Sequence, residues 1–230
     1  MEIKILEFTE GAKLARGVTV IIDVFRAFSV ECYAYDAGAI RIIATAGVSE
    51  AFQLRTKYRN SVLVGERDEK KIEGFDFGNS PTEIIKNDFK GKTVIHTTTA
   101  GTNGLINAAN ASVLLTGSLV NSGAIIKYIN SLSPEFVSLV AMGYRATQSS
   151  DEDLLCAEII SAGLKGEIHD YSKKILELKN NSGKRFFYHE NIDFSPPTDF
   201  LLCTMIDRFN FVLKAETRND GNIDLVRIDM

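Results

Sequence analysis

Short apolar runs alternate with longer amphipathic segments along most of the chain. The apolar runs are rich in β-branched residues, as expected of strands buried within a sheet, and they fall at residues 18–22, 41–44, 62–64, 93–95, 113–115 and 136–142. The intervening segments predict helices at residues 26–38, 49–58 and 151–164, and two more that begin near residues 105 and 121. This alternation predicts an α/β fold in three layers, with a mainly parallel central sheet flanked by helices.

The alternation of apolar runs and amphipathic segments becomes less regular after His169. Residues 171–179 predict a basic helix, and a short helix begins at Thr198, directly after two prolines. Residues 211–217 and 223–229 flank a polar turn that contains Gly221, and they predict a C-terminal hairpin. The sequence has no internal repeat and no low-complexity tract. It therefore predicts a single domain over residues 1–230.

The stretch 92–107, KTVIHTTTAGTNGLIN, combines a strand, a loop of hydroxyls and glycines, and the start of a helix. Backbone N–H groups at such a helix start have no partner, the helix dipole favours negative charge, and glycine lets the backbone approach a ligand. The stretch is typical of a loop that binds an anion. A tight connection between a strand and a helix, without a ligand, explains the same residues equally well.

Composition narrows the classes of partner. The formal net charge of −4 argues against nucleic acid or an anionic membrane as the main partner, and no apolar run approaches membrane-spanning length. Three widely spaced cysteines fit reduced thiols in the cytoplasm. The three histidines lack metal-ligand spacing, which argues against a zinc hydrolase. We expect a small-molecule ligand, no membrane, and a homodimer only on general grounds.

Polar residues follow the predicted strands, and in an open α/β sheet such residues converge at the carboxyl ends of the strands. They are Asp23, Arg26, Glu66, Arg67, Thr97 to Thr102, Asn121 and Gly143 to Arg145, and the helix start at 151–153 adds further acids. Carboxylates hold Mg²⁺, whereas the metal and guanidinium groups neutralise phosphoryl oxygens. This mixture of acids and arginines predicts an enzyme that acts on a phosphorylated substrate.

General phosphate-handling motifs are absent. The chain lacks GxxxxGK[ST], so it is not a P-loop nucleotidase, and it lacks a true GxGxxG. The DxD motif of haloacid-dehalogenase phosphatases is missing at Asp23, and Cys203 and Arg208 are too close for a tyrosine-phosphatase motif. His96 lacks the preceding arginine of histidine phosphatases.

Several separate motifs do match one family. The segments IIDVFRA (21–27), GER (65–67), GFDFGNSP (74–81), TTTAGT (97–102) and EDLLCA (152–157) resemble, in order, motifs of the 2-phosphosulfolactate phosphatase (ComB-like) family. The segment 207–209 is similar to the family's C-terminal region, so the resemblance runs from about Val18 to Val212. It implies an α/β fold and Mg²⁺-dependent hydrolysis of a small 2-phospho acid. In the family's reaction, 2-phospho-3-sulfolactate gives 3-sulfolactate and phosphate, a step toward coenzyme M.

Strand-end positions and the resemblance together give the candidate residues. The candidate catalytic residues are Asp23, Arg26, Glu66 and Arg67. The candidate substrate- and phosphate-binding residues are Asn79, Ser80, Thr98, Thr99, Gly101, Thr102, Asn121 and Arg145. The candidate Mg²⁺ ligands are Asp23, Asp76, Glu152 and Asp153. For Asn79 and Ser80, the assignment depends on the resemblance alone.

Each assignment has a structural alternative. Arg26 and Arg67 could form ion pairs with Asp23 and Glu66, and Asx-turn chemistry explains Asp76 nearly as well as metal binding. Acids in a first helical turn, as at 152–153, are favoured by the helix dipole alone. Arg145 could be a solvated loop charge that binds no substrate. His96 is expected to be a core histidine with its hydrogen bonds satisfied.

Two questions about function stay open at this stage. The phosphoryl group could be attacked by metal-activated water or by Asp23, which would form an acyl phosphate. The chain could also be a binder of a small phosphorylated or sulfonated metabolite without catalytic activity, or a lyase or isomerase that acts on a phosphorylated acid.

Overall fold

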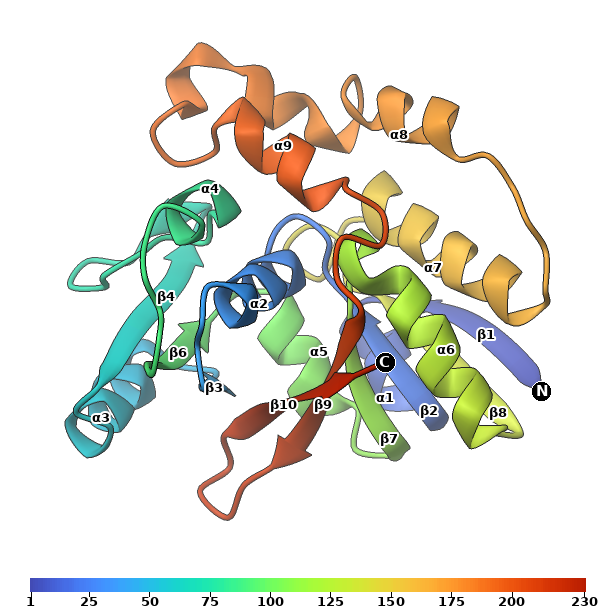
Figure 1. Ribbon diagram of the computed structural model, residues 1–230, viewed down its shortest axis with the longest axis horizontal. Coiled ribbons are helices and arrows are strands. Elements are labelled where there is room, and N and C mark those ends of the chain that lie inside the picture. Colours follow the sequence, from blue (N-terminus) through green and yellow to red (C-terminus); the bar gives the residue numbers. More distant parts are fainter.

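The computed structural model describes residues 1–230, and its centre is one open sheet of ten strands (Figure 1). The order of strands across the sheet is β1-β8-β2-β7-β9-β10-β3-β6-β4-β5. The strands are β1 (Glu2–Glu7), β2 (Gly17–Ile22), β3 (Arg41–Ala44), β4 (Ser61–Arg67), β5 (Lys70–Lys71), β6 (Thr93–Thr97), β7 (Ala111–Gly117), β8 (Phe136–Ala141), β9 (Phe211–Thr217) and β10 (Ile223–Asp229).

Helices cover the sheet and connect its strands. The α-helices are α1 (Phe8–Leu14), α2 (Ala27–Asp36), α3 (Val48–Lys57), α4 (Pro81–Ile84), α5 (Gly101–Asn107), α6 (Ser122–Leu132), α7 (Asp151–Leu164), α8 (Ser172–Leu178) and α9 (Pro197–Cys203). Three short 3₁₀ helices are η1 (Leu119–Asn121), η2 (Ser182–Phe187) and η3 (His189–Asn191). Figure 1 shows α8 and α9 together at one end of the molecule, above the ends of α2 and α7.

The C-terminal hairpin of β9 and β10 joins two groups of parallel strands. Strands β1, β8, β2 and β7 are parallel, and so are β3, β6 and β4, whereas β7–β9, β9–β10 and β10–β3 are antiparallel. Three antiparallel pairings reverse the strand direction between the groups. Residues that follow strands of both groups nevertheless line one pocket.

Alternating side chains of the strands enter two cores on opposite faces of the sheet. In β2, Val20 and Ile22 belong to the core beneath α6, α7 and α9, whereas Ile21 belongs to the core that contains α2 and α5. Nine of the ten residues of α2 are buried, including Glu31. A helix enclosed on all sides has no solvated face, so any polar side chain on it needs a partner inside the protein.

The predicted α/β class is confirmed, and so are the mainly parallel sheet and the terminal hairpin. The sequence pattern missed β1 and α1, because residues 2–7 alternate weakly and β1 is a half-exposed edge strand. It also gave no sign that the hairpin lies inside the sheet. No helix combines the length and the apolar character needed to cross a bilayer.

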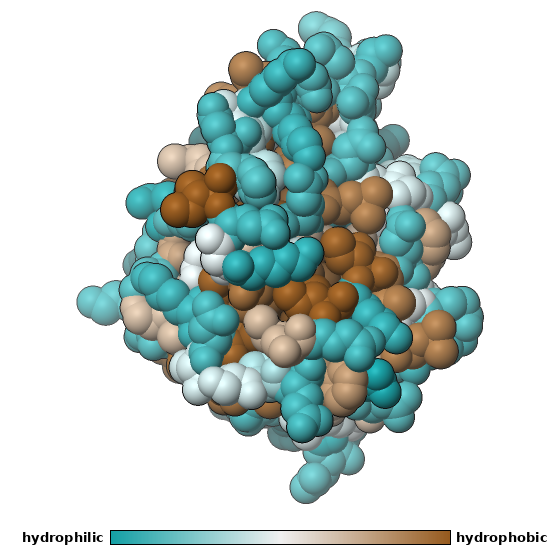
Figure 2. Space-filling view, turned by 90° about the vertical axis from the view of Figure 1, so that its right-hand side faces the viewer, coloured by the Kyte–Doolittle hydropathy of each residue, from teal (hydrophilic) through white to brown (hydrophobic).

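Figure 2 shows the side of the molecule on which β1, α6 and α7 lie, and apolar side chains gather near the middle of this face. A groove on the same side is lined by Ile126 of α6, Ile159 of α7 and Ile175 of α8. None of these residues lines the polar pocket at the strand ends.

Candidate active site

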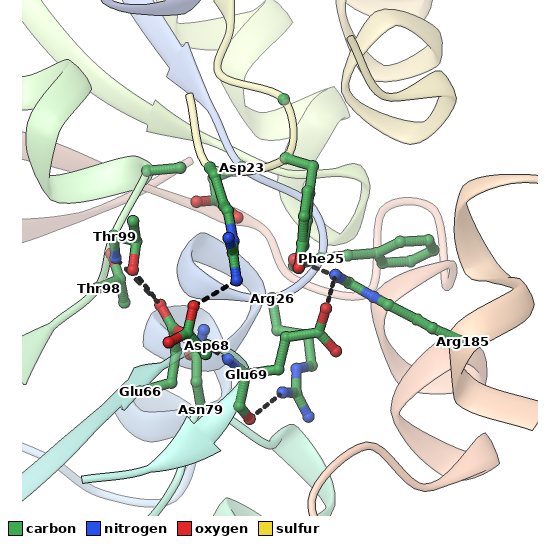
Figure 3. Close-up of a pocket in the computed structure, with 14 residues that line it drawn as sticks. Asp23, Phe25, Arg26, Glu66, Asp68, Glu69, Asn79, Thr98, Thr99 and Arg185 are labelled. Atoms are coloured by element: carbon green, nitrogen blue, oxygen red, sulfur yellow. Dashed lines mark hydrogen bonds and ion pairs between the residues drawn. The ribbon is translucent and has the colours of Figure 1, made fainter. Parts of the chain in front are cut away.

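A polar pocket lies where strands of both parallel groups end (Figure 3). Asp23 follows β2, Glu66 lies near the end of β4, Thr98 follows β6, and Gly143 lies shortly after β8. The lining residues are Asp23, Phe25, Arg26, Glu66, Asp68, Glu69, Asn79, Thr98, Thr99, Ala100, Gly143, Tyr144, Arg145 and Arg185. Only three of the fourteen are hydrophobic, so this pocket suits a polar ligand.

Asp23 is the most strongly perturbed acid that lines this pocket. Asp23 is 8% exposed, and its Oδ1 atom accepts a hydrogen bond of 3.3 Å from the backbone N–H of Ala27. Burial, together with the nearby carboxylates of Glu66, Glu152 and Glu31, raises the pKa of Asp23 to about 7. No arginine or lysine forms an ion pair with it. The site therefore holds a carboxylate whose negative charge is not compensated.

The loop of hydroxyls and glycines lies directly beside Asp23. A Cβ atom on Gly101 would be 3.1 Å from Asp23 Oδ2 and 2.9 Å from the ring of Phe28, so the loop can approach this closely only with glycine there. Glu66 Oε1 accepts hydrogen bonds of 3.0 Å from both the N–H and the hydroxyl of Thr99, which fastens the loop to β4. The N–H groups of Ala100 and Gly101 donate to no other backbone group.

Each arginine that lines the pocket is already paired with a carboxylate. Arg26 Nη1 lies 2.7 Å from Asp199 Oδ2, and Arg185 Nη1 lies 2.9 Å from Glu69 Oε1. The third, Arg145, pairs with Asp68 at the exposed rim. The arginines therefore leave the charge of Asp23 uncompensated.

Two further acids from the start of α7 face Asp23 across an adjoining cavity. Asp153 accepts hydrogen bonds of 2.8 Å from the N–H groups of Val24 and Gly143, so it holds the ends of β2 and β8 together. The Oε2 atom of Glu152 is buried without a hydrogen-bond partner. Burial raises the pKa values of both carboxyl groups.

This donor set fits a hard divalent cation. No three His, Cys, Asp or Glu side chains form a complete metal cage. Mg²⁺ does not need one, because it commonly binds through one or two carboxylates, several waters and the phosphate of the substrate. Asp23 and Glu152 line the same cavity, Glu152 has a free buried oxygen, and both are carboxylates whose charged forms are disfavoured by burial. A bound cation would stabilise those charged forms.

The structure brings most of the predicted site residues together. Those that line the pocket are Asp23, Arg26, Glu66, Asn79, Thr98, Thr99 and Arg145, and Glu152 and Asp153 line the adjoining cavity. Arg26 is nevertheless enclosed by protein groups, because it also donates to the carbonyl oxygens of Phe194 and Glu69. Its partner is Asp199, and neither of the predicted partners, Asp23 and Glu66, is paired with it.

Two predicted residues, Asp76 and Arg67, do not line the cavities around Asp23. Asp76 accepts a 2.8 Å hydrogen bond from the N–H of Leu63 and pairs with Arg55, so it fastens its loop to β4 and α3. It lies outside the cavities around Asp23. Arg67 donates to the carbonyl oxygens of Glu66 and Ala46 and to the hydroxyl of Thr97. It fastens neighbouring loops, and it does not line the pocket.

Four other predicted residues lie behind the pocket wall or away from it. Ser80 begins α4 and donates to Asp199, and Thr102 packs behind Thr98 with its hydroxyl 3.2 Å from that of Thr98. Gly101 makes room for Asp23, as described above. Asn121 is fully buried, where its side chain accepts from Ser118 and donates to Phe211. These residues support the pocket or the fold without lining the pocket.

Arg185 was not predicted from the sequence. It comes from η2, donates to the carbonyl oxygen of Phe25 at 2.9 Å, and lines both cavities. The neighbouring Phe186 is fully buried, so an apolar pair after Lys184 and Arg185 was the only sign that this segment packs on the domain. Nothing in the local pattern distinguished this arginine from a solvated one.

We expect the metal-free protein to lose stability as the pH rises. Asp23 has an ordinary pKa of 3.8 and a folded value of about 7, so between these values the folded protein holds a proton that the unfolded chain has lost. Its contribution is full below the ordinary pKa and is lost as the pH rises through about 7; Glu152 and Asp153 act in the same direction. Urea unfolding in EDTA at a series of pH values measures the free energy of unfolding. If this free energy falls with pH as steeply in Asp23→Asn as in the wild type, the expectation is wrong.

Comparisons with known proteins agree on one family. A family model described as 2-phosphosulpholactate phosphatase matches residues 3–217. A probable 2-phosphosulfolactate phosphatase of Caldanaerobacter subterraneus subsp. tengcongensis is 36% identical over 213 residues, which cover 86% of this chain and 87% of the relative. Proteins with the same description are 29% identical in Bacillus subtilis, over 91% of this chain and 90% of the relative, and 39% identical in Carboxydothermus hydrogenoformans, over 60% and 57%.

Proposed function

The chain belongs to the 2-phosphosulpholactate phosphatase family, and from this premise we propose that it hydrolyses the phosphate monoester of a small 2-phospho acid. The substrate is 2-phosphosulfolactate or a close analogue, and the products are the 2-hydroxy acid and phosphate. The observation that carries the proposal is the position of Asp23, whose carboxylate lies against a loop with free N–H groups.

In this proposal the loop binds the phosphoryl group. The N–H group of Ala100 and the hydroxyl of Thr98 donate to its oxygens, as oriented donors do where charge develops in a transition state. Glu66 keeps the loop in place through Thr99. Arg145 and Arg185 stand on another side of the pocket, where the N–H groups that are not engaged by Asp68 and Glu69 bind the carboxylate or sulfonate of the substrate.

Mg²⁺ is part of the proposal, with Asp23 and Glu152 as the side chains that would hold it. When bound, the ion supplies positive charge that neutralises phosphoryl oxygens. The pocket needs such a charge, because its arginines are already paired and Asp23 would otherwise repel a phosphate dianion. Asp153 holds the segments that follow β2 and β8 together at the site, because it accepts hydrogen bonds from the N–H groups of Val24 and Gly143.

Phosphate release tests the function. We expect the purified chain to release inorganic phosphate from 2-phosphosulfolactate in Mg²⁺, to lose most of this activity in EDTA, and to recover it when Mg²⁺ is restored. Phospholactate, which lacks the sulfonate, is the matched substrate, and we expect it to have a higher KM because it offers one anionic group fewer to the arginines. Chromatography of the products identifies the 2-hydroxy acid.

Other outcomes of this experiment favour the rival functions. Binding of the phospho acid without turnover, with the same affinity in EDTA and in Mg²⁺, would identify a binder without catalytic activity. Conversion of the substrate to a product that still carries its phosphate would identify an isomerase. Loss of phosphate with formation of a double bond would identify a lyase.

A further inference from the structure

A line of three buried polar side chains runs from the interior of α2 to the wall of the pocket. Glu31 is 2% exposed on α2, and its Oε1 atom lies 2.9 Å from Nδ1 of His96, which is 1% exposed on β6. Nε2 of His96 lies 3.3 Å from Oδ1 of Asn79. Asn79 lines the pocket (Figure 3). Glu31 and His96 do not line it, so they can act on a ligand only through Asn79.

The chemistry of the asparagine amide fixes the direction of the hydrogen bond between His96 and Asn79. The Oδ1 atom of an asparagine only accepts, so Nε2 of His96 must carry hydrogen and donate to it. Nδ1 then either donates to ionised Glu31 or accepts from protonated Glu31. Both arrangements keep two protons on the Glu31–His96 pair. Burial raises the pKa of Glu31, which favours retention of a proton on this pair.

The consequence for Asn79 is that its Nδ2 amino group is turned away from His96. This amino group donates to no other group of the protein, and it is not among the enclosed polar atoms without a partner, so it opens on the pocket. If His96 were an acceptor at Nε2, the amide would turn over and present Oδ1 to the pocket. An amino group attracts a phosphoryl oxygen, whereas a carbonyl oxygen repels it.

We propose that Glu31 and His96 are positioning residues that hold the Asn79 amide with its amino group toward the tetrahedral anion in the pocket. This inference rests on the proposed function, because it takes the phosphoryl group as the ligand. A buried carboxyl–imidazole pair contributes little to stability by itself, since the desolvation of both groups offsets their attraction. Orientation of a pocket amide gives the pair a role that an apolar pair could not fill.

The test measures binding of sulfate, a tetrahedral dianion that the chain cannot hydrolyse, at saturating Mg²⁺. We expect His96→Phe to weaken sulfate binding by about tenfold, as for loss of one hydrogen bond to a charged group, and Asn79→Ala to weaken it by about the same factor. In the double variant, His96→Phe should add nothing to Asn79→Ala, because no amide is left to orient. His96→Gln, whose amide can donate to Asn79, should restore binding to within about threefold of the wild type.

Thr45→Val is the matched control, since Thr45 is buried and its N–H donates to the carbonyl oxygen of His96 outside the line of three side chains. It should bind sulfate as the wild type does. A second measurement needs no variant at position 96. The ¹H–¹⁵N signals of the Asn79 side-chain amide, identified by their loss in Asn79→Asp, should shift when sulfate is added to the wild-type protein.

The outcomes separate this inference from the proposed function. Unshifted Asn79 signals, additive effects in the double variant, or no sulfate binding by the wild type overturn the inference. If the chain hydrolyses phospho acids and His96→Phe binds sulfate normally, the inference fails and the function stands. If no phospho acid is hydrolysed and the sulfate results are as expected, the function fails and the positioning role stands.

Discussion

Asp23→Asn is expected to lower kcat for the phospho acid by about 10³-fold or more, with a much smaller effect on KM. Asparagine has nearly the same shape as aspartate, so the contact with the loop at Gly101 is retained. It cannot attack phosphorus, and it lacks the charge that would hold a cation. Steady-state kinetics of phosphate release at saturating Mg²⁺ measure the change. A kcat within tenfold of the wild type would remove Asp23 from the chemistry.

Asp76→Asn is the matched control, because Asp76 also belongs to a family motif and lies away from the pocket. We expect its kcat to stay within about twofold of the wild type, since surface ion pairs such as Asp76–Arg55 contribute little. A separate acid-quench experiment distinguishes the two routes of attack. Acid quenching with labelled substrate should trap an acyl phosphate on Asp23 if the aspartate attacks, and no adduct forms if water attacks directly.

The sequence predicted the fold well because strand burial leaves a local pattern. The run at residues 18–22 is apolar on both faces, and the structure buries it beneath helices on both sides. The position of the hairpin within the sheet left no such pattern. It depends on short pairings, two residue pairs between β7 and β9 and three between β10 and β3, that join segments far apart in the chain.

The sequence predicted those site residues that lie at or just after the end of a strand. Asp23, Glu66 and Thr98 each lie at or just after the end of a buried strand, and the topology brings them together. Within one irregular loop, the sequence did not indicate which side chains face the pocket and which face the rest of the fold. Asp76 and Asn79 are three residues apart in one motif, yet Asp76 turns to Leu63 and Arg55 whereas Asn79 faces the pocket.

The partner of Arg26 shows a second limit. Sequence proximity suggested Asp23 or Glu66, but the observed partner, Asp199, is 173 residues away and fully buried. Asp199 comes from α9, in the region where the hydrophobic pattern loosens. Long-range pairs of this kind depend on how the last third of the chain packs over α2 and α4, and no local spacing encodes that packing.

Asp199→Ala is expected to lower the free energy of unfolding by about 3–5 kcal/mol. The side chain is fully buried, and its Oδ2 atom lies 2.7 Å from Nη1 of Arg26, which is itself 3% exposed. Its Oδ1 atom accepts from the hydroxyl of Ser80 and the N–H of Thr82, so it joins α2, α4 and α9. Alanine would leave a buried guanidinium without a counter-charge and two buried donors, the Ser80 hydroxyl and the Thr82 N–H, without their acceptor. Urea unfolding at neutral pH measures the loss.

Asp220→Ala provides the control, because Asp220 also pairs with an arginine, Arg218, but lies at the exposed hairpin turn. We expect it to cost less than about 1 kcal/mol. The double variant Arg26→Met with Asp199→Leu tests the cause of the larger loss. If the cost of Asp199→Ala comes from an unpaired buried charge, the double variant recovers much of the stability, because it buries no charge at this position. A double variant no more stable than Asp199→Ala would instead assign the loss to the missing contacts with Ser80 and Thr82.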